Sequence, residues 1–175
     1  MVAARKTLLN DAERSEAAER LFARLEQMAA FMVADKILVY HSLPDEMPTR
    51  RFIDKWAPRK RFYLPRVNGV NLDVLPYDKS RLHLGAFQIE EPDGDDVTSM
   101  DEIEMVVVPG VAYDMNGRRV GRGKGFYDRL LRDTHAIKIG IAYDFQIVDE
   151  IDNDEHDIDM DIILTDRRCV FVRKH

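Results

Sequence analysis

Three short, mostly apolar runs, at positions 36–41, 103–108 and 136–142, limit the folds that this chain can adopt. A run of this length without a polar face is typical of a strand that is covered on both sides. Central strands of parallel sheets are covered in this way, because helices pack on both faces of such a sheet. We therefore predict three buried strands at these positions.

Helical patterns lie around these runs. A long amphipathic helix is predicted from Asn10, because Glu13 has the spacing of a capping box and an apolar stripe follows. The stripe consists of Ala18, Leu21, Phe22, Leu25, Met28, Ala29 and Met32. Shorter helices are predicted at 49–57 and 125–132. Strands that alternate with helices predict an α/β fold of three layers, with helices on both faces of a mostly parallel central sheet.

A hairpin and several weaker elements complete the prediction. Residues 61–67 and 70–75 flank Asn68-Gly69, a dipeptide that strongly favours a two-residue hairpin turn. Final short strands are expected at 162–164 and 170–172. The other segments lack a clear period: an irregular stretch at 76–100 that can include a short strand around 87–89, a long loop at 109–123, and an acidic segment at 144–161.

Composition narrows the class of protein. A chain of 175 residues with 45% hydrophobic residues fits one domain over residues 1–175. A formal net charge of −6 argues against a protein that coats nucleic acid or anionic membrane. The single cysteine, Cys169, is interpreted as a core thiol in a reducing compartment. The N-terminus does not have the pattern of a signal peptide, so a cytoplasmic location is expected. A monomer is also expected.

The segment 117–128 combines glycine with positive charge, and it follows the strand expected at 103–108. Glycine lets consecutive backbone N–H groups face one anion, and arginine grips phosphate oxygens in a bidentate way. The spacing matches neither a Walker loop nor a dinucleotide-binding fingerprint. Open α/β sheets bind ligands at the carboxyl ends of their strands, so we predict a phosphate-binding loop rather than a solvated basic turn. Its glycines and cations are Gly117, Gly121, Gly123, Gly125, Arg118, Arg119, Arg122 and Lys124.

This segment resembles the signature of the 5-formyltetrahydrofolate cyclo-ligase family. The resemblance rests on Pro109, Gly110, Asp114, Gly117 and the run from Arg119 to Asp128. Weaker similarity extends over most of the chain from Asn10 onward, at Ser42, Asp45, Glu46, Thr49, the stretch 63–66, His156, Asp157 and Asp161. The resemblance implies that the chain closes 5-formyltetrahydrofolate to 5,10-methenyltetrahydrofolate, uses ATP and Mg²⁺, and releases ADP and phosphate. A phosphorylated formyl imidate would be the intermediate.

The resemblance also implies site residues. Asp128 and Asp157 would hold Mg²⁺, and Arg122 and Lys124 would act in catalysis. The folate would meet His41, Glu46, Arg122, Gly123, Lys124, Gly125 and Phe126. The ATP phosphates would meet Arg119, Val120, Gly121, Arg122, Gly123, Lys124, Gly125, Phe126 and Tyr127.

Several of these residues have a purely structural alternative. Asp128 has the spacing of a helical salt pair with Arg132. Asp157 lies in an acidic run of the kind that usually faces solvent. Glu46 is equally compatible with a surface acid near a helix. The aromatic side chains can wall a flat ring or belong to the core, and they are Tyr113, Phe126 and Tyr127.

Two other functions stay open at this point. Family members usually begin with a helix whose Lys and Arg, four residues apart, reach the ATP phosphates, and Arg5 and Lys6 do not match that spacing. The alternative is therefore a catalytically impaired homologue that binds folate or nucleotide without this clamp. An RNA-binding module that uses the basic residues of 50–61 and 118–124 is a third interpretation, against which the net charge of −6 argues.

Overall fold

The computed structural model describes residues 5, 8–44, 46–84, 90–152 and 157–172. The short strand expected around 87–89, and the positions Asp45 and His156, lie outside the described residues. No helix among the described residues is both long enough and apolar enough to cross a membrane.

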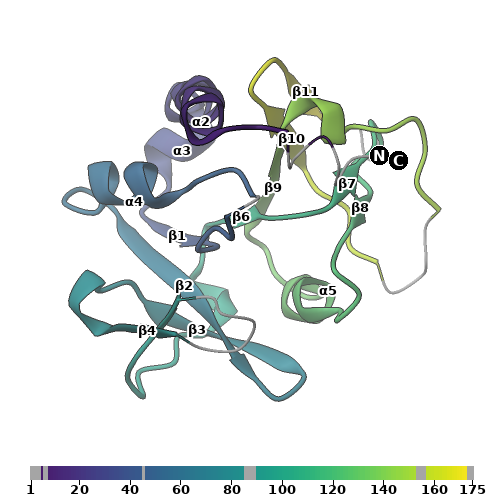
Figure 1. Ribbon diagram of the computed structural model, residues 1–175. Coiled ribbons are helices and arrows are strands. Elements are labelled where there is room, and N and C mark those ends of the chain that lie inside the picture. The colour runs from purple at the N-terminus through teal and green to yellow at the C-terminus, as the bar shows by residue number, and fades with distance from the viewer. Residues whose placement is uncertain (1–4, 6–7, 45, 85–89, 153–156, 173–175) are drawn as a thin grey trace.

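A seven-stranded sheet forms the centre of the molecule, in the order β11-β10-β9-β6-β1-β2-β3 (Figure 1). The five inner strands are parallel to one another, while β3 and β11 run antiparallel at the two edges. The prediction of a mostly parallel sheet is therefore confirmed. The strands are β1 (Lys36–Val39), β2 (Arg61–Asn68), β3 (Asn71–Pro76), β6 (Met105–Val108), β9 (Ile137–Ala142), β10 (Ile162–Thr165) and β11 (Cys169–Phe171).

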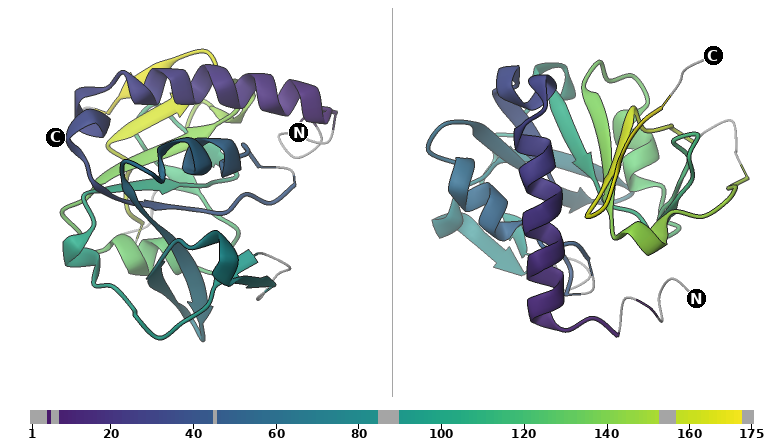
Figure 2. Two further views of the ribbon diagram at one scale, coloured as in Figure 1. Left: turned by 90° about the vertical axis from the view of Figure 1, so that its left-hand side faces the viewer. Right: turned by 90° about the horizontal axis from the view of Figure 1, so that it is seen from above.

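Helices cover both faces of this sheet, which confirms the three-layer prediction. On one face lie α2 (Asp11–Glu26), α3 (Ala29–Val33) and α4 (Arg50–Trp56), and on the other lies α5 (Phe126–Leu131) (Figures 1 and 2). Side chains alternate along a strand, so each central strand contributes to two cores. In β1, Ile37 and Val39 pack in the core beneath α2 and α4, while Leu38 packs in the core beneath α5. This double burial explains why these strands are apolar runs.

The long N-terminal helix was predicted as one element and is two. The capping box of Asn10 and Glu13 is present, but α2 ends at Glu26 and Met28 adopts an extended conformation (φ −73°, ψ 137°) before α3 begins. No glycine or proline marks this break. The turn lets Phe31 pack edge-on against Trp56, with ring centroids 5.0 Å apart, whereas Ala29 and Met32 of the predicted apolar stripe are exposed.

Short strands also occupy segments that were predicted to be irregular. The loop 109–123 contains a small hairpin of β7 (Ala112–Tyr113) and β8 (Arg119–Val120). The stretch 76–100 contains a second small antiparallel pair, β4 (Leu82–Leu84) and β5 (Glu90–Pro92). Three 3₁₀ turns complete the described elements, η1 (Lys79–Arg81), η3 (Met100–Glu102) and η4 (Asp144–Gln146).

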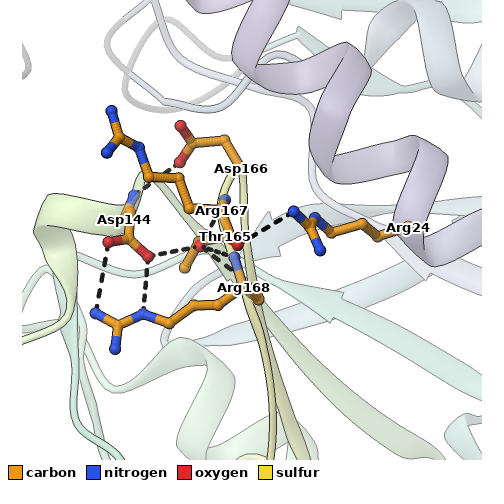
Figure 3. A network of polar contacts seen from close by, with 6 residues as sticks. All are labelled: Arg24, Asp144, Thr165, Asp166, Arg167 and Arg168. Carbon is orange, nitrogen blue, oxygen red and sulfur yellow. Dashed lines mark hydrogen bonds and ion pairs between the residues drawn. The ribbon is translucent and has the colours of Figure 1, made fainter.

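A polar network closes the carboxyl end of the sheet at β9 and β10 (Figure 3). The carboxylate of Asp144 accepts hydrogen bonds from the Thr165 hydroxyl and from Nε of Arg168, both at 2.8 Å. Asp166 accepts one from the backbone N–H of Asp144 at 2.9 Å. Burial acts to raise the pKa of Asp144, but the bonds from Thr165 and Arg168 outweigh it and lower that pKa below its ordinary value. These groups satisfy one another. An open ligand site at the carboxyl edge of the sheet is therefore expected beside other strands.

Candidate active site

An open cleft of about 680 Å³ lies where β1 and β6 end at the carboxyl edge of the sheet. The chain enters it directly after β1, at Tyr40 and His41, and directly after β6, at Pro109 and Gly110. The β2–β3 hairpin supplies an apolar wall of Pro65, Val67 and Leu72. The remaining lining residues are Leu43, Glu46, Glu91, the run from Arg119 to Asp128, Ile151, Asp152 and Asp157.

The buried carboxylate of Asp114 shapes the β7–β8 hairpin at the floor of this cleft. It is fully buried, and its Oδ1 atom accepts the backbone N–H groups of Asn116 at 2.9 Å and Arg118 at 3.1 Å. Its Oδ2 atom accepts the N–H of Ile151 at 2.9 Å, which ties the acidic segment to the hairpin. Gly117 takes the left-handed turn position with φ 85°. The hairpin therefore has a fixed shape, and its second strand presents Arg119 to the cleft.

The guanidinium of Arg119 is the most buried cation of the cleft, with its side chain 6% exposed. Its Nη1 atom donates to the carbonyl of Pro109 at 3.0 Å, and its Nη2 atom lies 3.8 Å from Oδ1 of Asp128. Its Nε atom is buried and has no hydrogen-bond partner among the described residues. A buried donor without a partner is costly, and the full charge of the guanidinium attracts an anion to the cleft that Arg119 lines.

The glycine-rich loop, from Gly121 to Gly125, lines the cleft. Gly123 (φ 90°) and Gly125 (φ 68°) both have left-handed backbones, a conformation that other residues adopt only with strain. Arg122 and Lys124 are exposed on this loop and line the cleft. The loop therefore brings two exposed positive charges to the cleft, whereas the charge of Arg119 is buried.

Glu46 lines the cleft in the segment after β1, and its side chain is 9% exposed. Its Oε1 atom accepts the backbone N–H of Leu43 at 2.8 Å, and its Oε2 atom lies 3.7 Å from Nη2 of Arg122. The loop that carries it is held by the Tyr40 hydroxyl, which donates to the carbonyl of Met47 at 2.8 Å. The alternative that Glu46 is a surface acid is therefore wrong, because the carboxylate is buried in the wall of the cleft. His41 lines the same wall and is half-buried.

The aromatic residues of the segment separate into two roles. Tyr113 belongs to the core beneath α5, and its hydroxyl donates to the carbonyl of Val108 at 2.7 Å. Phe126 and Tyr127 line the cleft. Burial, with a contribution from the Glu46 carboxylate, raises the pKa of Tyr127 well above its ordinary value, and the same two causes raise the pKa of Tyr40. Both hydroxyls therefore stay neutral and serve as hydrogen-bonding groups rather than as bases.

Both predicted metal ligands, Asp128 and Asp157, line the cleft. Oδ1 of Asp128 accepts the backbone N–H of Ile158 at 3.3 Å, and an ion pair of Asp128 with Arg132 is not among those of the described residues. The described residues contain no group of three or more His, Cys, Asp or Glu side chains that could hold a metal by themselves. Two carboxylates fit Mg²⁺ that is shared with phosphate oxygens, since Mg²⁺ is usually bound by one or two carboxylates with substrate phosphates and water.

The charges that line the cleft also favour Mg²⁺ bound together with phosphate. Three cationic side chains, Arg119, Arg122 and Lys124, face five carboxylates: Glu46, Glu91, Asp128, Asp152 and Asp157. A polyphosphate alone would add negative charge to a cleft that already has more carboxylates than cations. A divalent cation taken up with the phosphates would offset that excess, because a bound metal ion is often the largest local charge in a site.

Sequence reasoning missed part of the lining. Glu91 is buried, at 5% exposed, and its Oε2 atom accepts the backbone N–H of Val67 at 2.6 Å. The apolar wall of the β2–β3 hairpin was predicted as a hairpin but not as part of the site. Neither carries a local signal, because the irregular stretch 76–100 has no period and an apolar side chain on a strand has the same pattern in a core as in a cleft.

Comparison with known proteins gives consistent matches. The model of the 5-formyltetrahydrofolate cyclo-ligase family matches residues 1–166. The chain is 30% identical over 175 residues to the 5-formyltetrahydrofolate cyclo-ligase of Escherichia coli K12, which covers 94% of this chain and 96% of that protein. It is 28% identical over 146 residues to the mouse protein of the same name, with 74% of this chain and 72% of that protein covered.

Solved structures agree with these sequence matches. The NMR structure of Aquifex aeolicus 5,10-methenyltetrahydrofolate synthetase superposes with a TM-score of 0.89 at 29% identity, and the match covers 99% of this chain and 90% of that one. The 5,10-methenyltetrahydrofolate synthetase of Mycoplasma pneumoniae superposes with a TM-score of 0.75 at 22% identity over 94% of each chain, which bears on the fold alone.

Proposed function

Because the chain belongs to the 5-formyltetrahydrofolate cyclo-ligase family, we propose that it is the ATP- and Mg²⁺-dependent enzyme that converts 5-formyltetrahydrofolate to 5,10-methenyltetrahydrofolate. One observation carries the dependence on ATP and Mg²⁺. Arg119, Arg122 and Lys124 line a single cleft together with Asp128 and Asp157. A cluster of cations beside two carboxylates is the combination that phosphoryl transfer needs.

The chemistry explains why a phosphate site belongs in this enzyme. The formyl group of the substrate is an amide, so its carbon is a poor electrophile and its oxygen a poor leaving group. Transfer of the γ-phosphoryl group of ATP to the formyl oxygen gives an imidate phosphate and ADP. The neighbouring amine of the same folate then attacks the formyl carbon and loses its proton, and phosphate leaves with the oxygen. Because this closure is intramolecular, little entropy remains to be lost.

Each wall of the cleft has a task in this scheme. Arg119 would attract phosphate oxygens through the charge of its guanidinium, because it lines the cleft. Arg122 and Lys124 would neutralise charge on the group in transfer. Asp128 and Asp157 would hold Mg²⁺, which supplies further charge neutralisation when bound. On the folate side, Glu46 can accept N–H groups of the pterin, and the hairpin wall can cover its flat face.

The test is the growth of the methenyl chromophore from 5-formyltetrahydrofolate, measured with and without ATP and with and without Mg²⁺. Growth is expected only when both are present. Lys124→Ala should lower kcat by about 10²–10³-fold, the range for removal of one donor that stabilises transition-state charge. Lys79→Ala is the matched control, because Lys79 is exposed and lies outside the cleft.

Growth without ATP would contradict the proposed mechanism. Absence of growth under all conditions, with folate binding still detected by calorimetry, would identify a binding protein instead of an enzyme.

A further inference from the structure

The side chain of Arg129 connects two segments that are far apart in the sequence. Arg129 lies in α5, and its Nη2 atom donates to the carbonyl of Lys124 at 2.7 Å, in the glycine-rich loop. The same atom donates to the carbonyl of Val70, at the tip of the β2–β3 hairpin and 59 residues away. The guanidinium carbon also lies 5.7 Å from the centre of the Phe126 ring.

The two segments that Arg129 joins form two of the walls of the cleft. The hairpin contributes Pro65, Val67 and Leu72 to one wall, and the glycine-rich loop contributes Lys124 and its neighbours to the other. Both acceptors are main-chain carbonyls, so the contact depends on the position of the backbone and not on which side chains the walls carry. Nη2 suits this task, because it carries two hydrogens in the plane of the guanidinium and can donate one to each carbonyl.

We propose that Arg129 is a positioning residue that fixes the hairpin wall and the glycine-rich loop relative to each other. The inference rests on the proposed function for its kinetic consequence. The hairpin wall would receive the folate and the loop would grip the phosphates. The separation of the two walls therefore determines how the formyl oxygen meets the phosphoryl group.

Each wall has its own source of stability, which separates positioning from folding. The hairpin is held by the hydrogen-bond ladder between β2 and β3. Six residue pairs are in register in this ladder, from Tyr63 with Pro76 to Asn68 with Asn71. The β7–β8 hairpin that leads into the loop is held by Asp114. Arg129 itself is exposed. Loss of its side chain should therefore leave the fold intact and change only the relation between the walls.

The local backbone at Gly125 fits this arrangement. Gly125 has φ 68°, and a Cβ atom built there would lie 2.8 Å from Nη1 of Arg129. The absence of a side chain at this position thus leaves room for the guanidinium to pass over the start of α5 and reach the hairpin.

The test compares Arg129→Ala and Arg129→Lys with Arg132→Ala, which removes an exposed arginine at the C-cap of the same helix. In Arg129→Ala, kcat should fall by roughly 10–100-fold, because small displacements of reacting groups are costly, while each KM changes less than about threefold. Arg129→Lys should recover part of this loss. Arg132→Ala should match the wild type.

Amide hydrogen exchange gives a readout that does not depend on turnover. In Arg129→Ala, exchange should accelerate together at residues 69–72 and 123–126, with the rest of the sheet unchanged. Equal exchange in the hairpin of the wild type and Arg129→Ala, or an unchanged kcat in an active enzyme, would overturn the inference. If the wild type has no turnover, the proposed function fails, and the exchange data still decide whether Arg129 joins the walls.

Discussion

Replacement of Asp114 should destabilise the protein by an amount that follows from its three hydrogen bonds. In Asp114→Ala, the N–H groups of Asn116, Arg118 and Ile151 lose their acceptor; Asp114 is fully buried and the three hydrogen bonds are part-buried. Each buried donor without a partner costs about 1–3 kcal/mol. The three donors belong to one network, so their costs are not additive. We therefore take the lower end of the range, about 3 kcal/mol in the free energy of unfolding.

Asp114→Asn should cost less, because one amide oxygen can still accept the two hairpin N–H groups. Its amide nitrogen would then face the N–H of Ile151, which leaves one donor without a partner, at about 1–3 kcal/mol. Urea unfolding measures both variants. Asp133→Ala, at an exposed aspartate, should stay within about 0.5 kcal/mol of the wild type. A loss below about 1 kcal/mol in Asp114→Ala would refute the view that this carboxylate shapes the floor of the cleft, because it is less than one lost partner should cost.

Two further predictions concern Mg²⁺ and acid. Asp128→Asn should raise the Mg²⁺ concentration for half-maximal activity by roughly tenfold or more, since Mg²⁺ sites rely on one or two carboxylates; an unchanged Mg²⁺ titration would remove Asp128 from the metal site. Asp144→Asn should unfold more easily than the wild type at pH 7. The folded-state pKa of Asp144 lies below its ordinary value, so its contribution to stability is present above the unfolded-state pKa and is lost as the pH falls through the folded-state pKa. The difference in stability between Asp144→Asn and the wild type should therefore narrow in acid. A difference that persists in urea unfolding at low pH would contradict a stabilising role of the Asp144 carboxylate.

The central architecture could be predicted from sequence because its signals are local. The apolar runs of β1, β6 and β9 reflect burial on two faces, and the capping box at Asn10 marks the start of α2. The break at Met28 carries no such signal, since it arises from the packing of Phe31 against distant aromatic rings. The β7–β8 hairpin was missed because its strands are two residues long and its shape depends on a buried carboxylate.

The candidate site was predictable to the extent that it is contiguous in sequence. The run from Arg119 to Asp128 lines the cleft as one stretch, and its glycines and cations are visible without a structure. Glu91 and the hairpin wall were not predicted, because their place in the cleft follows from strand order and not from neighbouring residues. The hydrogen bond from Arg129 to Val70 could not be predicted either, since it joins residues that are 59 positions apart.

The order of strands in the sheet gives this cleft a thermodynamic role. Its lining comes from described residues in four parts of the chain, after β1, in the β2–β3 hairpin, after β6 and around Asp152 and Asp157, together with Glu91. The unfolded chain does not hold these parts together. A ligand that needs all of them binds the native state alone. At a free concentration one hundred times its dissociation constant, such a ligand adds about 2.7 kcal/mol to the stability of the whole chain. Occupancy of the cleft and resistance to unfolding are therefore linked, so the melting temperature of this protein is also a measure of what it has bound.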